Sequence, residues 1–161
     1  MRRNSVLYLV GGVLLFMSLK AYSAPKQADA FRELFKFVED NEGLPPNLLL
    51  RLAQQESMFN PLATNPSGAQ GMMQIIPRWH PGVDPFDPAQ AIPYAGKFLA
   101  AQYARFGSWR AALAAYNWGP GNVSKALRRH SGDINALLAD VSVPVETRNY
   151  VAQITADVTV V

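Results

Sequence analysis

Apolar residues recur at helical spacing along most of the chain, and this periodicity is the feature that most restricts its fold. The first such segment spans residues 29–41, and its apolar face is formed by Phe31, Leu34, Phe35 and Val38. Similar patterns follow in residues 92–106, in residues 109–118 and toward the C-terminus, where Val151, Ile154 and Val158 recur. No segment has a convincing strand alternation, and no internal repeat or low-complexity linker interrupts the chain. The sequence therefore predicts a compact all-α domain of about seven or eight helices.

Capping residues set the expected helix boundaries. Asp87-Pro88 is interpreted as an N-cap followed by proline at the first helical position, and Ser108 and Asn47 as N-caps of two other helices. Pro93 is expected to kink its helix or to delay the start. The segments between helices are rich in Pro, Gly, Asn or Ser, which indicates loops at residues 60–71 and 77–88. Residues 71–76, between these loops, are interpreted as one or two helical turns.

A lone carboxylate, Glu56, follows an apolar helical stretch. Leu49, Leu52, Ala53 and Glu56 stand at i, i+3, i+4 and i+7, so they share one helix face, and the next acidic residue downstream is Asp84. A carboxyl group on a buried face is costly to ionise, so its pKa should rise. A carboxylic acid that stays protonated near neutral pH is what a general acid needs. The alternative is an ordinary surface glutamate near a helix end.

The first 23 residues have the order of a secretory leader. Arg2 and Arg3 precede an apolar stretch at residues 6–19, and Ala21-Tyr22-Ser23 is a small-x-small cleavage signal. The apolar stretch is shorter than the roughly 20 residues of a membrane-spanning helix. We therefore expect a signal peptide that is cleaved after Ser23 and a mature chain in the periplasm or cell envelope. An uncleaved N-terminal anchor is the alternative.

Charge and composition narrow the class of partner. Loss of the leader removes three basic residues and no acid, which lowers the net charge from +3 to 0. A nucleic-acid partner, which needs a basic face, is therefore not expected. The chain has no cysteine, which excludes disulfides and thiolate metal sites. His80 and His130 are too isolated in the sequence to indicate a metal site.

Four motifs occur in a fixed order after the leader. They are Gln55-Glu56-Ser57, residues 71–75 (GMMQI), residues 115–121 (AYNWGPG) and residues 146–151 (ETRNYV). Each motif alone is weak, but together they closely resemble the soluble lytic transglycosylase family over about residues 44–155. The resemblance implies a lysozyme-like α fold and cleavage of the MurNAc–GlcNAc bond of peptidoglycan, which leaves a 1,6-anhydro-muramoyl end without a cofactor or metal. The implied organisation is a leader (1–23), a helical segment (24–43) and a catalytic domain (44–161).

The resemblance also assigns site residues. Glu56 matches the catalytic acid/base, and the matching substrate-binding positions are Ser57, Met73, Gln74, Tyr116, Asn117, Glu146 and Tyr150. Several of them have a purely structural alternative: a helix-end role for Ser57, a core position for Met73, a buried aromatic with a satisfied hydroxyl for Tyr116, and a helix-start carboxylate for Glu146. The chain departs from the family pattern at Ala91, Pro93 and Trp118, which leaves the local cleft shape and substrate preference open.

A transglycosylase needs only one carboxylate, which explains why Glu56 stands alone. Glu56 protonates the leaving oxygen and then accepts the proton of the sugar's own 6-hydroxyl group. A muramidase that uses Glu146, Asp84 or Asp87 as a second carboxylate is the first alternative. The other is a glycan-binding component of a secretion, conjugation or phage-entry machine. The chain is expected to act on glycan strands as a monomer.

Overall fold

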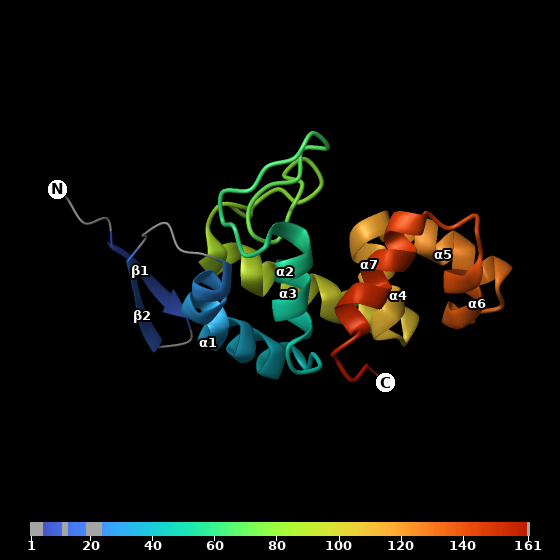
Figure 1. Cartoon of the computed structure of the whole chain (residues 1–161), viewed down its shortest axis with the longest axis horizontal. Helices are drawn as coiled ribbons and strands as arrows, with labels where there is room; N and C mark the ends of the chain where they lie inside the picture. Colours follow the sequence, from blue (N-terminus) through green and yellow to red (C-terminus); the bar gives the residue numbers. More distant parts are fainter. Residues whose placement is uncertain (1–4, 11–12, 19–23, 161) are drawn as a thin grey trace.

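The computed structural model describes residues 5–10, 13–18 and 24–160, and its folded domain is all-α, as predicted. Seven helices occur in the described part of the chain: α1 Ala24–Glu42, α2 Leu48–Ser57, α3 Pro88–Phe106, α4 Trp109–Trp118, α5 Pro120–Arg129, α6 Ile134–Ala139 and α7 Val145–Thr155. In Figure 1, α5 and α6 lie at one end of the molecule and α1 lies toward the other, with α2 between them. A long loop, residues 58–87, joins α2 to α3.

Residues 5–18 contain two strands, which the sequence analysis did not predict. β1 (Ser5–Val10) pairs with β2 (Val13–Ser18) in antiparallel register, from Ser5 opposite Ser18 to Val10 opposite Val13. Apart from the terminal serines Ser5 and Ser18, both strands are unbroken runs of apolar or aromatic residues, so the search for alternation missed them. The expected cleavage position after Ser23 lies outside the described residues. Among the residues that the structure describes, no helix is long and apolar enough to cross a membrane.

The α4 helix forms the centre of the core. All five residues from Ala111 to Ala115 are buried, and α3, α5 and α7 pack around them. Four of these five residues are alanines, whose small side chains let the neighbouring helices approach from several sides. On the other side of α3, Gly96 lies against α1, where an added Cβ would be 2.3 Å from Cγ1 of Val38. The core therefore brings α1, α3 and α4 together at close distances.

The start of α2 is capped by a side chain from α1. Asn47 precedes α2 with a φ of 67° and its side chain makes no capping hydrogen bond, so the prediction that it caps the helix is wrong. Instead the carboxylate of Glu39 accepts hydrogen bonds from the backbone N–H groups of Asn47 (2.8 Å), Leu49 (2.8 Å) and Leu50 (3.3 Å). Glu39 is only 5% exposed, and burial raises its pKa despite these bonds. The contact fixes the helix that carries Glu56 to α1.

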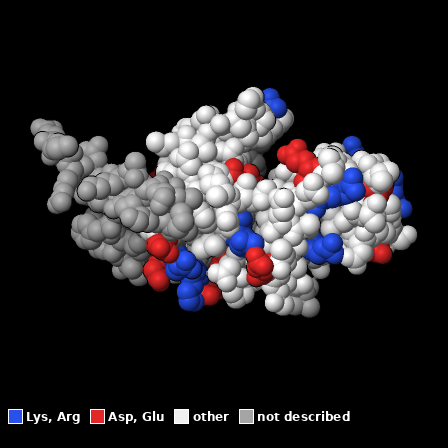
Figure 2. All heavy atoms as spheres, viewed as in Figure 1, with Lys and Arg blue, Asp and Glu red and all other residues white. Residues whose placement is uncertain are grey.

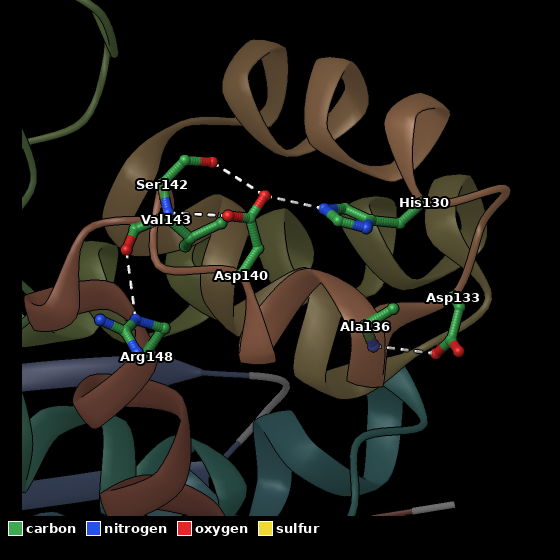
Figure 3. Close-up of polar contacts among 7 residues, drawn as sticks. All are labelled: His130, Asp133, Ala136, Asp140, Ser142, Val143 and Arg148. Carbon is green, nitrogen blue, oxygen red and sulfur yellow. Dashed lines mark hydrogen bonds and ion pairs between the residues drawn. The ribbon is translucent and has the colours of Figure 1, made fainter.

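The other predicted caps are confirmed. The Asp87 side chain accepts from the N–H of Ala89 (3.0 Å), and Ser108 Oγ accepts from the N–H of Ala111 (3.4 Å). α3 begins at Pro88, so Pro93 does not delay its start. At the α5–α7 end, the Asp140 carboxylate accepts from Ser142 and pairs with His130 Nε2 (2.9 Å), as Figure 3 shows.

The 58–87 loop folds back on itself before α3. Residues 71–76, interpreted from the sequence as helical turns, form a single tight turn that is closed by two backbone hydrogen bonds between Gln70 and Ile75 (3.0 and 2.9 Å). The N–H of Gly71 donates to the carbonyl of Ala63 (2.8 Å), which ties the turn to the first part of the loop. A glycine with a φ of +72° stands where the chain reverses, because a side chain there is strained. The turn presents Gln74 toward α4.

Charged side chains are dispersed over the face seen in Figure 2. Lysines and arginines appear toward the α5–α7 end and over α1, and they are separated by neutral and acidic side chains.

Candidate active site

Glu56 stands in the last turn of α2, on the apolar face of the helix, and is less deeply buried than its apolar neighbours there. Leu49, Leu52 and Ala53 on the same face are fully buried, whereas Glu56 is half-buried. The pKa of the Glu56 carboxyl is raised to about 7: burial raises it most, a hydrogen bond from Tyr150 lowers it, and the negative charge of Glu146 makes a smaller upward contribution. Both protonation states of Glu56 are therefore populated near neutral pH. The raised pKa expected from the sequence is confirmed.

Tyr150 from α7 is the direct partner of Glu56. Its hydroxyl donates a hydrogen bond to Oε1 of Glu56, and the residue is 4% exposed. Burial and the nearby carboxylate raise the pKa of Tyr150 well above its ordinary value, so the hydroxyl keeps its proton. A donor that stays protonated stabilises the ionised form of Glu56. The pair joins two motifs that are 94 positions apart in the sequence.

Two hydroxyl groups hold the tight turn of the loop against the helices. Ser57 Oγ donates to the carbonyl of Met72 (2.8 Å), and the Tyr116 hydroxyl donates to the carbonyl of Met73 (2.7 Å). Both methionines are fully buried. The predicted role of Met73 as a wall of the sugar groove is therefore corrected: its side chain belongs to the core, because the turn points it inward, and only its carbonyl faces a site residue.

Gln74 follows these methionines in a strained backbone conformation, with a φ of 48°. Its Nε2 donates to the carbonyl of Gly71 (2.9 Å), and its Oε1 accepts from Nδ2 of Asn65 (3.0 Å). The half-buried side chain lines a pocket together with Tyr116. The left-handed backbone conformation costs free energy for a residue other than glycine, and residues in such conformations cluster at functional sites.

The motif at residues 115–121 contacts the motif at residues 146–151 through Thr147, a residue that the sequence analysis did not select. Thr147, which is 1% exposed, donates from Oγ1 to Oδ1 of Asn117 (2.7 Å). The contact orients the Asn117 amide and joins α4 to α7. Its only signal in the sequence was its place inside the Glu146-Thr147-Arg148 motif. Glu146 itself is exposed in the first turn of α7, close enough for its charge to raise the pKa of Glu56.

The motifs thus converge on one place, between the end of α2, the tight turn, α4 and α7. Glu56 and Glu146 supply the two carboxyl groups, and Tyr150 donates to Glu56. Tyr116 lies near both Glu56 and Gln74: its pKa is raised first by burial and next by the charge of Glu56, and it lines a pocket with Gln74. Within the described residues, no group of three or more His, Cys, Asp or Glu side chains could hold a metal ion. Chemically, the arrangement offers one carboxyl group that gives up and regains a proton near neutral pH.

The all-α fold, with a carboxyl group of raised pKa at the end of α2, is that of a lysozyme-like helical domain. The chain belongs to the family described as the transglycosylase SLT domain, whose sequence profile matches residues 33–137. The match begins inside α1 and ends in α6. It therefore includes the helix whose Glu39 caps α2.

The curated relatives and solved structures that the chain resembles are lytic transglycosylases. The chain is 35% identical over 142 residues to the soluble lytic murein transglycosylase of Escherichia coli K12, which covers 79% of this chain and 22% of the relative. It is 35% identical over 107 residues to the membrane-bound lytic murein transglycosylase F of Alcanivorax borkumensis, with 60% and 23% covered. The crystal structure of the 70-kDa soluble lytic transglycosylase of Escherichia coli superposes with a TM-score of 0.68 at 29% identity, over 84% of this chain and 28% of that one. The chain thus spans less than a quarter of the length of these curated relatives.

Tyr150→Phe is expected to move the pH dependence of glycan cleavage. The variant removes the donor that favours the Glu56 carboxylate, while burial and the Glu146 charge, which favour the acid, remain. The pKa of Glu56 therefore rises, and the high-pH limb of the kcat/KM profile should move to higher pH. The matched control is Tyr116→Phe, whose hydroxyl donates to the Met73 carbonyl and not to Glu56. A limb that stays in place in Tyr150→Phe, or that moves equally in both variants, would contradict this assignment.

Proposed function

We propose that the chain is a peptidoglycan lytic transglycosylase, which cleaves the β-1,4 bond between MurNAc and GlcNAc and leaves a 1,6-anhydro-MurNAc end. The observation that carries the proposal is Glu56, a half-buried carboxyl group whose pKa is about 7. The family of the chain and the names of its relatives support the same activity. The substrate is the glycan strand of the cell wall.

In this mechanism Glu56 acts first as an acid and then as a base. The protonated carboxyl gives its proton to the glycosidic oxygen as the bond from that oxygen to C1 of MurNAc breaks. The resulting carboxylate takes the proton from the 6-hydroxyl of the same sugar as O6 bonds to C1. One bond is exchanged for another, the proton returns to Glu56 and no water is consumed. Intramolecular attack by O6 has a high effective molarity, on the order of 10⁵ M or more when the geometry is good.

The neighbours of Glu56 support both halves of this cycle. Burial and the Glu146 charge favour the protonated form that begins the reaction, and the Tyr150 hydroxyl favours the carboxylate that follows. The neighbouring acetamido group of the sugar assists departure of the leaving oxygen. Ser57, Tyr116 and Gln74 shape the wall of the cleft beside the tight turn, and Asn117 contributes through its amide.

A hydrolytic muramidase is the second candidate, and the position of Glu146 favours it. The Asp84 carboxylate accepts from the N–H of Phe86 (2.9 Å), and Asp87 accepts from Ala89 and Gln90, so both are engaged in the turn that starts α3. Glu146 is exposed and acts electrostatically on Glu56. It is therefore the side chain best placed to serve as a second carboxylate.

Product analysis separates these two functions. Digestion of purified sacculi should release muropeptides that are one water lighter than hydrolytic products, without a reducing muramic acid end. Glu146→Gln should weaken the activity at most about tenfold, because in the transglycosylase its charge only adjusts the pKa of Glu56. Mass spectra dominated by reducing, hydrated ends, together with loss of activity in Glu146→Gln, would establish the muramidase instead.

Export of the chain is part of the same proposal. The order of residues 1–23 supports delivery to the periplasm or cell envelope, with residues 24–161 as the mature enzyme that acts as a monomer, either alone or as a component of a secretion, conjugation or phage-entry machine. N-terminal sequencing of the protein from an exporting host should find Ala24 as the first residue. A chain that still begins at Met1 would favour the membrane anchor.

A further inference from the structure

Two carboxyl groups stand at opposite ends of α2: Glu39, which reaches the start of the helix from α1, and Glu56, which lies in the last turn. Glu56 has a direct partner in Tyr150 of α7. Glu39 has no part in the proposed mechanism, and it precedes the catalytic domain (44–161) that the resemblance implies. It bears on the acid all the same, because a helix of ten residues is short and stiff and carries a shift of one end to the other.

The Glu39 carboxylate needs both of its oxygens to hold the start of α2. Oε2 accepts from the N–H of Asn47, and Oε1 accepts from the N–H groups of Leu49 and Leu50. The first N–H groups of a helix have no partner within the helix, and hydrogen bonds from them to an ionised acceptor are strong. A protonated carboxyl group or an amide cannot reproduce the arrangement, because one of its two polar atoms then carries hydrogen toward the N–H groups.

The recess around Glu39 supplies no cation that could replace these hydrogen bonds. Its charged side chains all come from α1: Arg32, Lys36, Glu39 itself and Asp40. Both basic side chains are paired with aspartates of the same helix, Asp29 and Asp40, and not with Glu39. The start of α2 contributes only uncharged side chains to the recess, and α3 contributes none. The charge of Glu39 is therefore directed at the backbone of α2.

The remaining contacts of α2 fix its position along the helix axis less well. Its buried side chains are all apolar: Leu48, Leu49, Leu52 and Ala53. Apolar contacts are not directional, so they hold the helix against the core but resist sliding only weakly. Arg51 pairs with Asp157, whose side chain is 70% exposed, and an exposed ion pair contributes little. Directional contacts to buried partners therefore occur at the two ends of the helix, through Glu39 at the start and through Glu56 and Ser57 at the end.

We propose that Glu39 is a positioning residue: its ionised carboxylate sets the place of α2 along the helix axis and thereby holds Glu56 within hydrogen-bond reach of Tyr150. α1 packs on α3, α3 on α4 and α4 on α7, so Glu39 and Tyr150 belong to one frame that holds α2 at both ends. By this inference α1 is part of the catalytic unit and not a separate segment. The inference rests on the proposed function for the role of Glu56 as the acid.

Glu39→Gln tests this role. The amide keeps the size of the side chain but loses one of the two acceptors, so α2 should shift slightly. We expect kcat on soluble glycan strands to fall about tenfold, because proton transfer is sensitive to small displacements, and KM to stay within about twofold. The high-pH limb of the kcat/KM profile should move to higher pH, because the hydrogen bond from Tyr150, which lowers the pKa of Glu56, is weakened.

The direction of that shift separates positioning from a direct effect of charge. Loss of a negative charge would lower the pKa of Glu56 and move the limb to lower pH, whereas loss of stability alone would move no limb. In the Tyr150→Phe background, Glu39→Gln should cause no further shift, because the hydrogen bond through which it acts is already absent. The matched control is Asp40→Asn, which removes the neighbouring charge, bonded only to Lys36, and should leave kcat and the limb in place.

Several outcomes would overturn the inference. They are a wild-type kcat in folded Glu39→Gln, a limb that stays in place or moves to lower pH, and a further shift in the double variant. Burial raises the pKa of Glu39, so the neutral amide should be tolerated by the fold. If it is not, Glu39→Asp keeps the charge, shortens the reach by one methylene and should give the same changes. Unfolding of both variants at the assay temperature would show that Glu39 supports the fold alone.

Failure of the inference is distinct from failure of the proposed function. Carbon-13 NMR titration of Glu56 measures the same pKa shift without turnover. Anhydro products from the wild type with an unshifted Glu56 in Glu39→Gln would remove the positioning role alone. Reducing products together with the expected shift would remove the transglycosylase mechanism alone.

Discussion

Glu56→Gln is expected to lower peptidoglycan cleavage by about 10³-fold, because the amide can neither donate a proton to the leaving oxygen nor accept one from the 6-hydroxyl. The fold should persist. Glutamine is isosteric with glutamate, and its amide oxygen can still accept the hydrogen bond from Tyr150. Removal of a carboxyl group that is costly to ionise at this site should leave the thermal stability equal or higher. Turnover on sacculi and thermal unfolding of the purified variant measure the two effects separately.

The matched control for this variant is Glu33→Gln, which makes the same chemical change at an exposed position on α1. It should retain full activity, which excludes a general effect of lost negative charge. Wild-type turnover by a folded Glu56→Gln protein would refute the assignment of Glu56. Activity lost equally in both variants would point to a charge effect on binding of the polymer.

Local signals in the sequence predicted most of the helical fold. Apolar spacing identified the buried face of α1, and the Asp87 and Ser108 caps lie where the sequence placed them. These features depend on residues within one or two turns of each other, so a single sequence contains the needed information. Glu56 could be selected as the candidate acid for the same reason, because its helix face and its isolation are both visible in the sequence.

Features that depend on distant partners could not be predicted in this way. The cap of α2 comes from Glu39 on another helix. Asn47 is of a residue type that often caps helices, but its side chain makes no capping hydrogen bond here. Thr147 acquires its role by meeting Asn117 across 30 positions. Met73 stands in a motif next to groove residues, but the direction of its side chain is decided by the tight turn, which the sequence alone did not define. In each case a tertiary contact decides a feature that the local sequence does not determine.

The same turn gives the second large expected effect: Gly71→Ala should destabilise the fold by about 3 kcal/mol or more, because backbone strain and steric overlap add. Gly71 has a φ of +72°, and a Cβ at this position would lie 1.6 Å from the carbonyl oxygen of Pro85. That neighbour is backbone, so no side-chain rotation relieves the overlap. Relief requires the turn and the Pro85 segment to separate, which disturbs the Met73 carbonyl and Gln74. Chemical denaturation and cleavage of sacculi measure the two consequences.

Comparison with Gly68→Ala isolates the steric part of that effect. Gly68 lies in the same loop with a φ of +88°, and nothing stands within 4 Å of its added Cβ, so its substitution introduces backbone strain alone. Strain of this kind costs about 1–2 kcal/mol, and activity should be retained because Gly68 makes no contact with the site residues. The difference between the two variants therefore reports how tightly the turn is held against Pro85. If both substitutions cost the same, the turn can move away from Pro85, and the close packing inferred for this side of the cleft is wrong.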